Sequence, residues 1–249
     1  GIRDIGVTGV QTCALPIFPS PPYREMKRGQ RILALILARA GSRRLPKKNK
    51  RLLGKKPLIV WSIESVKGIK AIASTLVSTD DPGLARIAKR AGALVPWLRP
   101  RSLAGPRSPS AQAALHALRW YETEIGKVDG VLLLQPTSPF RKKRSIQKAI
   151  HLFGRNHGLP VISVTPVNLG TAFLLRHRKK PKTENATSYK IFRPNGNIYL
   201  CSPEQLRIRR SFIGLRNVLL PMRSIKENID IDTFSDLEFA KKALQSGWK

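Results

Sequence analysis

ILALILARAGSRRLPKKN, residues 32–49, joins a run of six aliphatic residues to a loop that carries five cations and one glycine. A continuous apolar run of this length, followed by turn residues, is typical of a buried strand. Gly41 permits a tight turn, and the cations can neutralise phosphate charge. The spacing of a P-loop is absent. The stretch therefore predicts a strand followed by a triphosphate-binding loop, with a basic surface loop that binds nothing as the alternative.

Outward from this stretch, short apolar runs keep alternating with longer amphipathic ones, which is typical of βα units. We therefore predict an α/β fold with a mostly parallel sheet and flanking helices. Further strands are expected at Thr75–Ser78, Val131–Leu134, Val161–Thr165, Asn197–Leu200 and Asn228–Thr233. Helices are expected from Pro57 to about Lys67, from Pro82 to about Ala91, from Ser110 to about Glu124, and after Thr233 to about Gln245.

The positions of the strand ends predict where a ligand binds. In open α/β sheets, ligands lie at the carboxyl ends of the strands. The loops after Leu37, Ser78 and Leu134 should therefore line one site. The second of these loops also holds Asp81 beside Pro82, a pair that favours a helix start because the carboxylate can accept from free backbone N–H groups.

One domain is expected over residues 26–249, with a polar and basic excursion from the sheet at about 166–190. Residues 1–25 have scattered Pro and Gly and no periodicity, and residues 7–17, VTGVQTCALPI, resemble a DNA-sequencing adapter read in frame. We expect residues 1–25 to be a leader outside the fold, either non-native or disordered.

Charge is the unusual feature of the composition. Lys and Arg number 46 against 15 Asp and Glu, giving a formal net charge of +31. Such a field attracts nucleotides, nucleic acids and anionic surfaces without choosing among them, and a solvated basic surface is the plain alternative. Two cysteines cannot build a disulfide framework, and no apolar run could cross a bilayer, so a cytoplasmic protein without a membrane partner is expected.

Six blocks of sequence resemble the acylneuraminate (CMP-nonulosonic acid) cytidylyltransferase family, in family order and with family spacing. The first is the loop at residues 38–49, close to the family pattern A-R-x-x-S-K-x-x-P-x-K-N. The others are residues 77–80, 98–100, 133–141, 193–196 and 230–233. The resemblance implies a Rossmann-like nucleotidyltransferase fold and a homodimer in which the excursion reaches the neighbouring subunit.

The resemblance also implies which residues bind CTP. Arg39, Ser42 and Lys48 would contact the phosphates, and Arg43 stands where the family usually has Lys. Asn49, Arg99 and Ser110 fall at positions around the nucleotide. Near the last of these, Pro106–Ser110 replaces an Asp-Thr-Ala-Ser stretch found in many members, so an acidic residue is lost there. Catalytic roles are implied for Arg39, Lys48 and Asp232.

A metal site and a sugar-binding site are also expected beside the CTP-binding residues. Asp230 and Asp232 alternate on the expected strand, so both carboxylates would face the same way and could hold Mg²⁺; a cap or an ion-pair role is the alternative. For the sugar, Gln135 could bind hydroxyls and Arg193 a carboxylate, with Asn195 beside them. A structural amide and a surface ion pair are the corresponding alternatives for Gln135 and Arg193.

The implied activity is transfer of CMP from CTP to the anomeric hydroxyl of an acidic nine-carbon sugar of the sialic type, with release of pyrophosphate. Legionaminate, pseudaminate and 3-deoxy-octulosonate are alternative acceptors. An inactive, nucleic-acid-binding relative is the alternative of another class. Only 6% of the residues are aromatic, and none is interleaved with the basic runs, so any nucleic-acid contact is expected to be non-specific and driven by charge.

Overall fold

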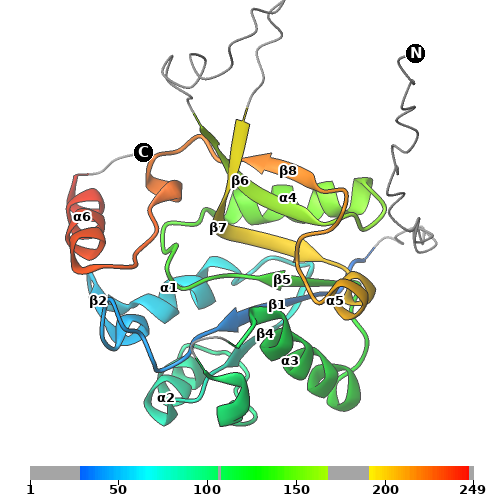
Figure 1. Cartoon of the computed structure of the whole chain (residues 1–249), viewed down its shortest axis with the longest axis horizontal. Helices are drawn as coiled ribbons and strands as arrows, with labels where there is room; N and C mark the ends of the chain where they lie inside the picture. Colours follow the sequence, from blue (N-terminus) through cyan, green and yellow to red (C-terminus); the bar gives the residue numbers. More distant parts are fainter. Residues whose placement is uncertain (1–28, 106–107, 168–190, 247–249) are drawn as a thin grey trace, which may run out of the picture.

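A computed structural model describes residues 29–105, 108–167 and 191–246. Its main feature is a six-stranded sheet in the order β4-β1-β5-β7-β6-β8 (Figure 1). The strands are β1 (Ile32–Leu37), β4 (Ile72–Ser78), β5 (Gly130–Leu133), β6 (Val161–Val167), β7 (Ile191–Cys201) and β8 (Val218–Pro221). Among the strands of this sheet that the structure describes, only β7 runs against its neighbours, β5 and β6, and the other pairings are parallel. The predicted α/β fold with a mostly parallel sheet is confirmed.

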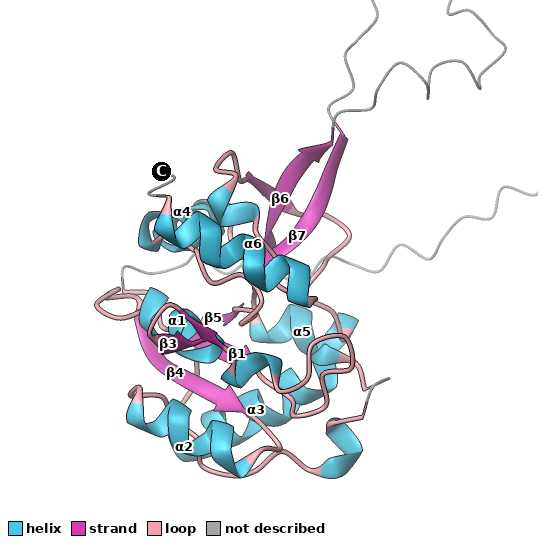
Figure 2. Cartoon of the chain, turned by 90° about the vertical axis from the view of Figure 1, so that its left-hand side faces the viewer, coloured by secondary structure: helices cyan, strands magenta, loops and turns pink. Residues whose placement is uncertain are grey.

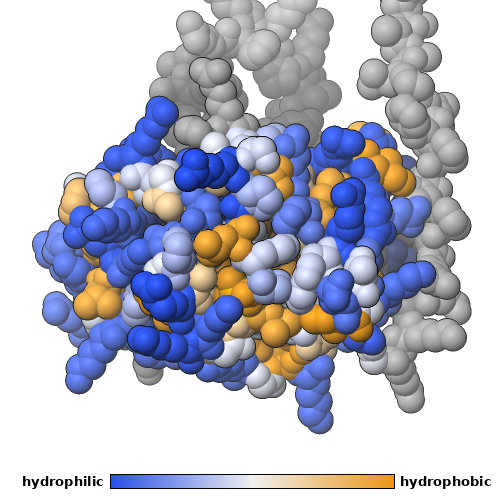
Figure 3. Space-filling view, turned by 90° about the horizontal axis from the view of Figure 1, so that it is seen from below, coloured by the Kyte–Doolittle hydropathy of each residue, from blue (hydrophilic) through white to orange (hydrophobic). Residues whose placement is uncertain are grey.

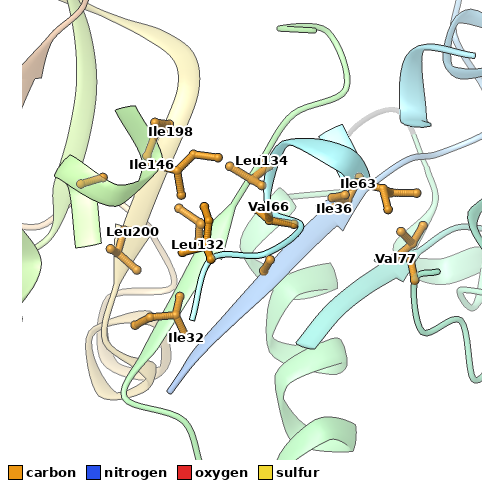
Figure 4. Packing of buried hydrophobic residues seen from close by; sticks show 14 of the residues in the cluster. Ile32, Ile36, Ile63, Val66, Val77, Leu132, Leu134, Ile146, Ile198 and Leu200 are labelled. Carbon is orange, nitrogen blue, oxygen red and sulfur yellow. The ribbon is translucent and has the colours of Figure 1, made fainter. Parts of the chain in front are cut away.

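Helices cover both faces of the sheet. One face carries α1 (Leu58–Ser65), α2 (Pro82–Arg90) and α4 (Lys143–Arg155); the other carries α3 (Ser110–Glu124) and α5 (Pro203–Arg209). Strand β1 shows why both faces are needed, since successive side chains point to opposite sides of a sheet. Ile32 and Ile36 pack with α1 and α4 (Figure 4), whereas Leu33 and Leu35 pack with α3.

A third apolar cluster joins the basic loop to the end of the chain. The loop that follows β1 contains the short 3-10 helix η1 (Lys48–Lys50) and a hairpin of β2 (Leu52–Leu53) and β3 (Lys56–Pro57). Leu45 and Leu53 of this region pack against Ile231 and against α6 (Phe234–Gln245). This packing brings residues near position 45 next to residues near position 231.

The structure corrects one predicted strand. Residues 228–233 form no ladder: η4 (Lys226–Asn228) is followed by irregular chain up to α6. The only backbone bond from this segment to the sheet's loops among those described joins Ile231 N to Thr137 O at 2.8 Å. The apolar and acidic alternation that suggested a strand is real, since Ile229 and Ile231 are buried and Asp230 is exposed. Burial on one side alone produced the pattern.

Strands β6 and β7 extend beyond the rest of the sheet as a two-stranded ribbon (Figures 1 and 2). Both strands are longer than expected, and residues 166–167 belong to β6 rather than to the excursion. The remainder of the expected excursion, residues 168–190, lies outside the described residues, as does the whole of the expected leader at 1–25.

The surface seen in Figure 3 is mostly hydrophilic, with apolar residues gathered near the middle of that face. No helix within the described parts of the chain is both long and apolar enough to span a membrane.

Candidate functional site

Three loops meet at the carboxyl edge of the parallel strands, as expected from the sequence. Ala38 N donates to Ser78 O at 3.0 Å, and Leu134 N donates to Leu35 O at 3.0 Å. Ala40 N donates to the carboxylate of Asp80 at 2.8 Å. The loops after β1, β4 and β5 are therefore linked to one another within a few residues of where their strands end.

Arg39 is the basic residue that the sheet positions most directly. It lies two residues after β1 and is half-buried, and its Nη1 donates to Gly105 O at 3.1 Å. Asn49 is buried, and its Nδ2 donates to Arg39 O at 3.2 Å. Asn49 thus fixes the backbone that carries Arg39. Ser42 is half-buried and Arg43 is exposed.

Lys48 and Asp232 form the strongest link between distant parts of the predicted site. Lys48 Nζ lies 2.7 Å from Asp232 Oδ1, and Arg44 also pairs with this carboxylate. Burial raises the pKa of Asp232, but the bonds and charges of Lys48 and Arg44 outweigh it and hold the pKa below its usual value. The structure therefore unites two of the three expected catalytic residues, through the ion pair that was the alternative interpretation of Asp232.

The two predicted metal ligands leave the core together. Ile229 and Ile231 are buried, Asp230 is exposed and Asp232 is half-buried. Among the described residues there is no group of three or more His, Cys, Asp or Glu able to hold a metal ion. Two carboxylates suit magnesium, which usually keeps waters and substrate phosphates as its other ligands. The donor chemistry suits magnesium, while in this structure both oxygens of Asp232 pair with cations, Oδ1 with Lys48 and Oδ2 with Arg44.

Gln135 lies against the block at residues 193–196. Gly196 has a φ of +75°, and a β-carbon there would come within 3.0 Å of Gln135 Oε1. Tyr199, which the sequence reasoning did not single out, belongs to the same region. Burial raises the pKa of its hydroxyl, the Gly196 backbone N–H lowers it, and the charge of Asp230 raises it. The amide of Gln135 and the phenol of Tyr199 therefore lie near Gly196, and the charge of Asp230 acts on that phenol.

Asn195 and Arg193, the other two residues predicted to bind the sugar, differ from each other in their surroundings. The Asn195 amide donates to Asn228 Oδ1 at 2.9 Å and to Thr165 Oγ1 at 3.3 Å, and it accepts from Ser163 Oγ at 2.6 Å. It also accepts from Asn197 N at 3.2 Å. All of its bonding capacity is used to order the ribbon. Arg193 is exposed on the ribbon, opposite Thr165 of β6.

Arg99 and Ser110 border the loops from the other side. Arg99 is buried, and it donates from Nε to Ser78 Oγ at 2.9 Å and from Nη2 to Ser78 O. Burial lowers the pKa of Arg99, Asp80 raises it, and Arg39 lowers it. Ser110 is exposed at the first position of α3. Arg99 therefore supports the end of β4, and in the altered loop at 106–110 residues 106–107 lie outside the described part.

A buried arginine in the third loop and a buried glutamate that acts on it by charge were given no role from the sequence. Arg141 ends the block at residues 133–141 and opens a run of four cations, and only 5% of it is exposed. Glu227, whose charge acts on Arg141, is also 5% exposed. Composition could not separate Arg141 from its three basic neighbours, because burial here depends on contacts with residues far along the chain.

A family model described as Cytidylyltransferase matches residues 33–245. The chain is 37% identical over 225 residues to the CMP-N,N'-diacetyllegionaminic acid synthase of Legionella pneumophila, covering 86% of the chain and 97% of that protein. It is 31% identical to the N-acylneuraminate cytidylyltransferase of Escherichia coli, covering 84% of the chain and 51% of that protein.

More distant relatives extend the comparison. Identity is 28% to the pseudaminic acid cytidylyltransferase of Campylobacter jejuni, over 84% of the chain and 94% of that protein. A solved structure of CMP:2-keto-3-deoxy-manno-octonic acid synthetase complexed with CTP superposes with a TM-score of 0.64 at 17% identity. It covers 87% of the chain and 99% of that structure. At this identity the likeness shows the fold alone.

Proposed function

The chain belongs to the cytidylyltransferase family, and from that premise we propose that it transfers CMP from CTP to the anomeric hydroxyl of a nonulosonic acid, releasing pyrophosphate. The observation that carries the proposal is the meeting of the basic loop at 38–49 with Asp232 at the edge where Gln135 also lies. Cations for a triphosphate, carboxylates for a metal and an amide for a sugar come together there.

The basic loop binds the triphosphate in this proposal. Arg39, Ser42, Arg43 and Lys48 contact phosphate oxygens, and Asn49 holds the loop backbone in place through Arg39 O. A guanidinium presents its donors as a rigid planar fork that matches two phosphate oxygens, whereas an ammonium on a flexible stem fixes no such geometry. Arg99 and Ser110 flank the nucleotide, with Arg99 acting through the end of β4.

The chemical step is an in-line displacement. The anomeric oxygen forms a bond to the α-phosphorus, the bond from that phosphorus to the bridging oxygen of the β-phosphate breaks, and pyrophosphate leaves with the electron pair. The hydroxyl proton passes to solvent. The chain's part is to hold the two substrates in line and to balance negative charge with Arg39 and Lys48, and no covalent intermediate is required.

Asp230 and Asp232 would hold the magnesium ion. Magnesium supplies charge neutralisation at the triphosphate when bound. Lys48 and Arg44 pair with Asp232 and keep its pKa low, which favours the ionised carboxylate that a metal ion would need.

Gln135 and Arg193 are proposed to bind the sugar acid, Gln135 through hydroxyls and Arg193 through the carboxylate. Asn195 acts by ordering the ribbon that carries Arg193, because its amide has no bonding capacity left for a substrate. N,N'-diacetyllegionaminic acid is the first acceptor to test, since the relative named for it is 37% identical over nearly its whole length.

The test is pyrophosphate release with CTP and magnesium against a panel of legionaminic, sialic, pseudaminic and 3-deoxy-octulosonic acids. We expect a nine-carbon acid to be turned over with the highest kcat/KM. No release with any nine-carbon acid, or a clear preference for the eight-carbon acid, would contradict the proposed substrate class.

Binding of nucleic acid is the second candidate, and the net charge of +31 is the observation that favours it. A filter-binding measurement at physiological salt separates the two. We expect weak RNA binding that falls steeply with salt, because it rests on charge alone. Nanomolar affinity together with no turnover of CTP would reverse the order of the two candidates.

A cytoplasmic location is proposed for the enzyme, in keeping with the free, buried thiol of Cys201.

A further inference from the structure

We propose that Arg141 is a positioning residue for the transfer reaction: its buried guanidinium fixes the sugar-binding loop at Gln135 relative to the segment that carries Asp230 and Asp232. The roles of Gln135 and of the two aspartates rest on the proposed function. The placement of Arg141 does not, because it follows from hydrogen bonds within the chain.

Arg141 reaches acceptors on three separate elements. Nη2 donates to Gln135 O at 3.0 Å, within its own loop. Nε donates to Asn197 of β7, to O at 2.8 Å and to Oδ1 at 2.7 Å. Nη1 donates to Ser62 Oγ of α1 at 3.3 Å. One side chain therefore ties the loop after β5 to the strand beside it and to the helix behind it.

Glu227 completes the cluster from the opposite side. Its Oε1 accepts from Lys142 N at 3.1 Å and from Ser145 Oγ at 2.6 Å, at the start of α4. The first turn of that helix has no acidic residue of its own, so Glu227 supplies the negative charge that a helix N-terminus favours. Burial lowers the pKa of Arg141 to about 9, against the raising effect of Glu227, so the guanidinium remains charged at neutral pH.

The same cluster reaches the carboxylate segment. Asn197, held by Arg141, donates from Nδ2 to Glu227 O at 2.6 Å. Glu227 and Asn228 end η4, and Asp230 comes two residues after that helix. Ile231 N then donates to Thr137 O at 2.8 Å, back in the loop of Gln135. The loop and the carboxylate segment are thus joined at both ends, through Asn197 at one end and Thr137 at the other.

A buried charged pair is weak evidence for a stabilising role, because well-packed apolar residues often stabilise a fold equally well. The rigid fork of a guanidinium instead offers donors in fixed directions, which Lys cannot reproduce. Misplacing a reacting group by about 1 Å can cost about 100-fold in rate. A device that fixes two substrate-binding segments relative to each other therefore acts on the chemical step more than on the stability of the fold.

The experiment compares Arg141→Lys and Asn197→Ala with Arg144→Lys, the same exchange at an exposed position three residues along. For Arg141→Lys we expect CTP affinity, measured by calorimetry without sugar, to stay within about 2-fold. We expect kcat with the sugar acid to fall by about 10- to 100-fold. Amide hydrogen exchange at residues 229–233 should become faster. Asn197→Ala should change the same quantities in the same direction, and Arg144→Lys should change none.

Three outcomes decide the proposal. Arg141→Lys and Asn197→Ala could both melt at a lower temperature while their folded fraction keeps the wild-type kcat, KM and amide hydrogen exchange at residues 229–233. In that case Arg141 is structural only and the proposal is overturned. If Arg141→Lys does not fold, Asn197→Ala decides on the same readouts. If the wild-type protein turns over no sugar acid, the proposed function fails, while CTP affinity and hydrogen exchange in the variants still show whether Arg141 holds the two segments.

Discussion

Lys48 and Asp232 are 184 positions apart in the chain, yet in the fold Lys48 Nζ lies 2.7 Å from Asp232 Oδ1. Each of them alone is an ordinary charged residue in a chain with many cations. Their contact matters because it joins the loop proposed for phosphate to the segment proposed for metal. At the scale of single residues, the proposed site therefore depends on which charged side chains the fold brings into contact.

Arg39 is expected to contribute more to CTP use than any other cation of its loop. Its backbone is fixed by β1 and by Asn49, whereas Lys47 is exposed and has a φ of 55°. A charged hydrogen bond is worth about 1.5–3 kcal/mol, so Arg39→Ala should lower kcat/KM for CTP by about 10- to 100-fold. Lys47→Ala is the control and should be nearly silent. Equal losses in the two variants would mean that the loop acts only as a diffuse positive field.

Asp230→Asn and Asp232→Asn should nearly abolish turnover in magnesium, because each removes a charged oxygen from the proposed metal site. Asp230 is exposed and Asp232 is half-buried, so stability should change by no more than about 1 kcal/mol. Steady-state kinetics and calorimetric Mn²⁺ binding with CTP present would measure the two effects. A double Asn variant that keeps wild-type rates would remove the metal role from these residues.

Helix α2 shows how local chemistry sets an element. Asp81 accepts from Gly83 N at 2.7 Å and from Leu84 N at 3.1 Å, as its place before Pro82 predicts. Asp81→Ala should lower the free energy of unfolding by about 1 kcal/mol through loss of the cap. Asp81→Asn keeps an acceptor oxygen and should lose less. Chemical denaturation of the three proteins would measure this, and an Ala variant as stable as wild type would contradict it.

The same cap predicts a dependence of stability on pH. Burial raises the pKa of Asp81, but the bonds from Lys50, Leu84 and Gly83 hold it below its ordinary value of 3.8. A depressed carboxyl pKa stabilises the fold above the unfolded value, and that contribution is lost as pH falls through the folded value. We expect the free energy of unfolding of the wild type to exceed that of Asp81→Asn at neutral pH, and this difference to be lost only below about pH 4. A constant difference between the two proteins from pH 7 to pH 2 would refute this.

Element boundaries elsewhere depended on contacts that are distant in sequence. The segment before α6 has the alternation of a strand, yet it lies against Leu45 and Phe140 without joining a ladder. Periodicity reports which side of a segment is buried, and it does not report whether a hydrogen-bonding neighbour is present. The same limit applies to β8, which was not expected from the sequence. Helices α4 and α5 were not expected either, although the helical spacing of Ile146, Ala149, Ile150 and Phe153 and the cap at Ser202 before Pro203 are local signals for them.

At the scale of the whole molecule, we expect a homodimer at micromolar concentration and physiological salt. The ribbon of β6 and β7 stands clear of the sheet (Figure 2) and leads into the expected excursion, which as a polar segment needs a partner surface. The charge of +31 opposes association, so the dimer should weaken at low salt. Sedimentation that shows a monomer at both salt concentrations would exclude it.

The sequence by itself determined the fold class, the position of β1, the cap of α2 and the edge of the sheet where the site lies. Each of these follows from local patterns, since apolar period, capping residues and strand ends are read within about ten residues. Only the tertiary structure decided that Asn195 is used up within the ribbon, that Arg99 supports β4, and that Arg141 is buried among acceptors. The role of a polar side chain depends on which partners the fold brings within 3 Å or so. Those partners lie tens of residues away, where no local pattern records them.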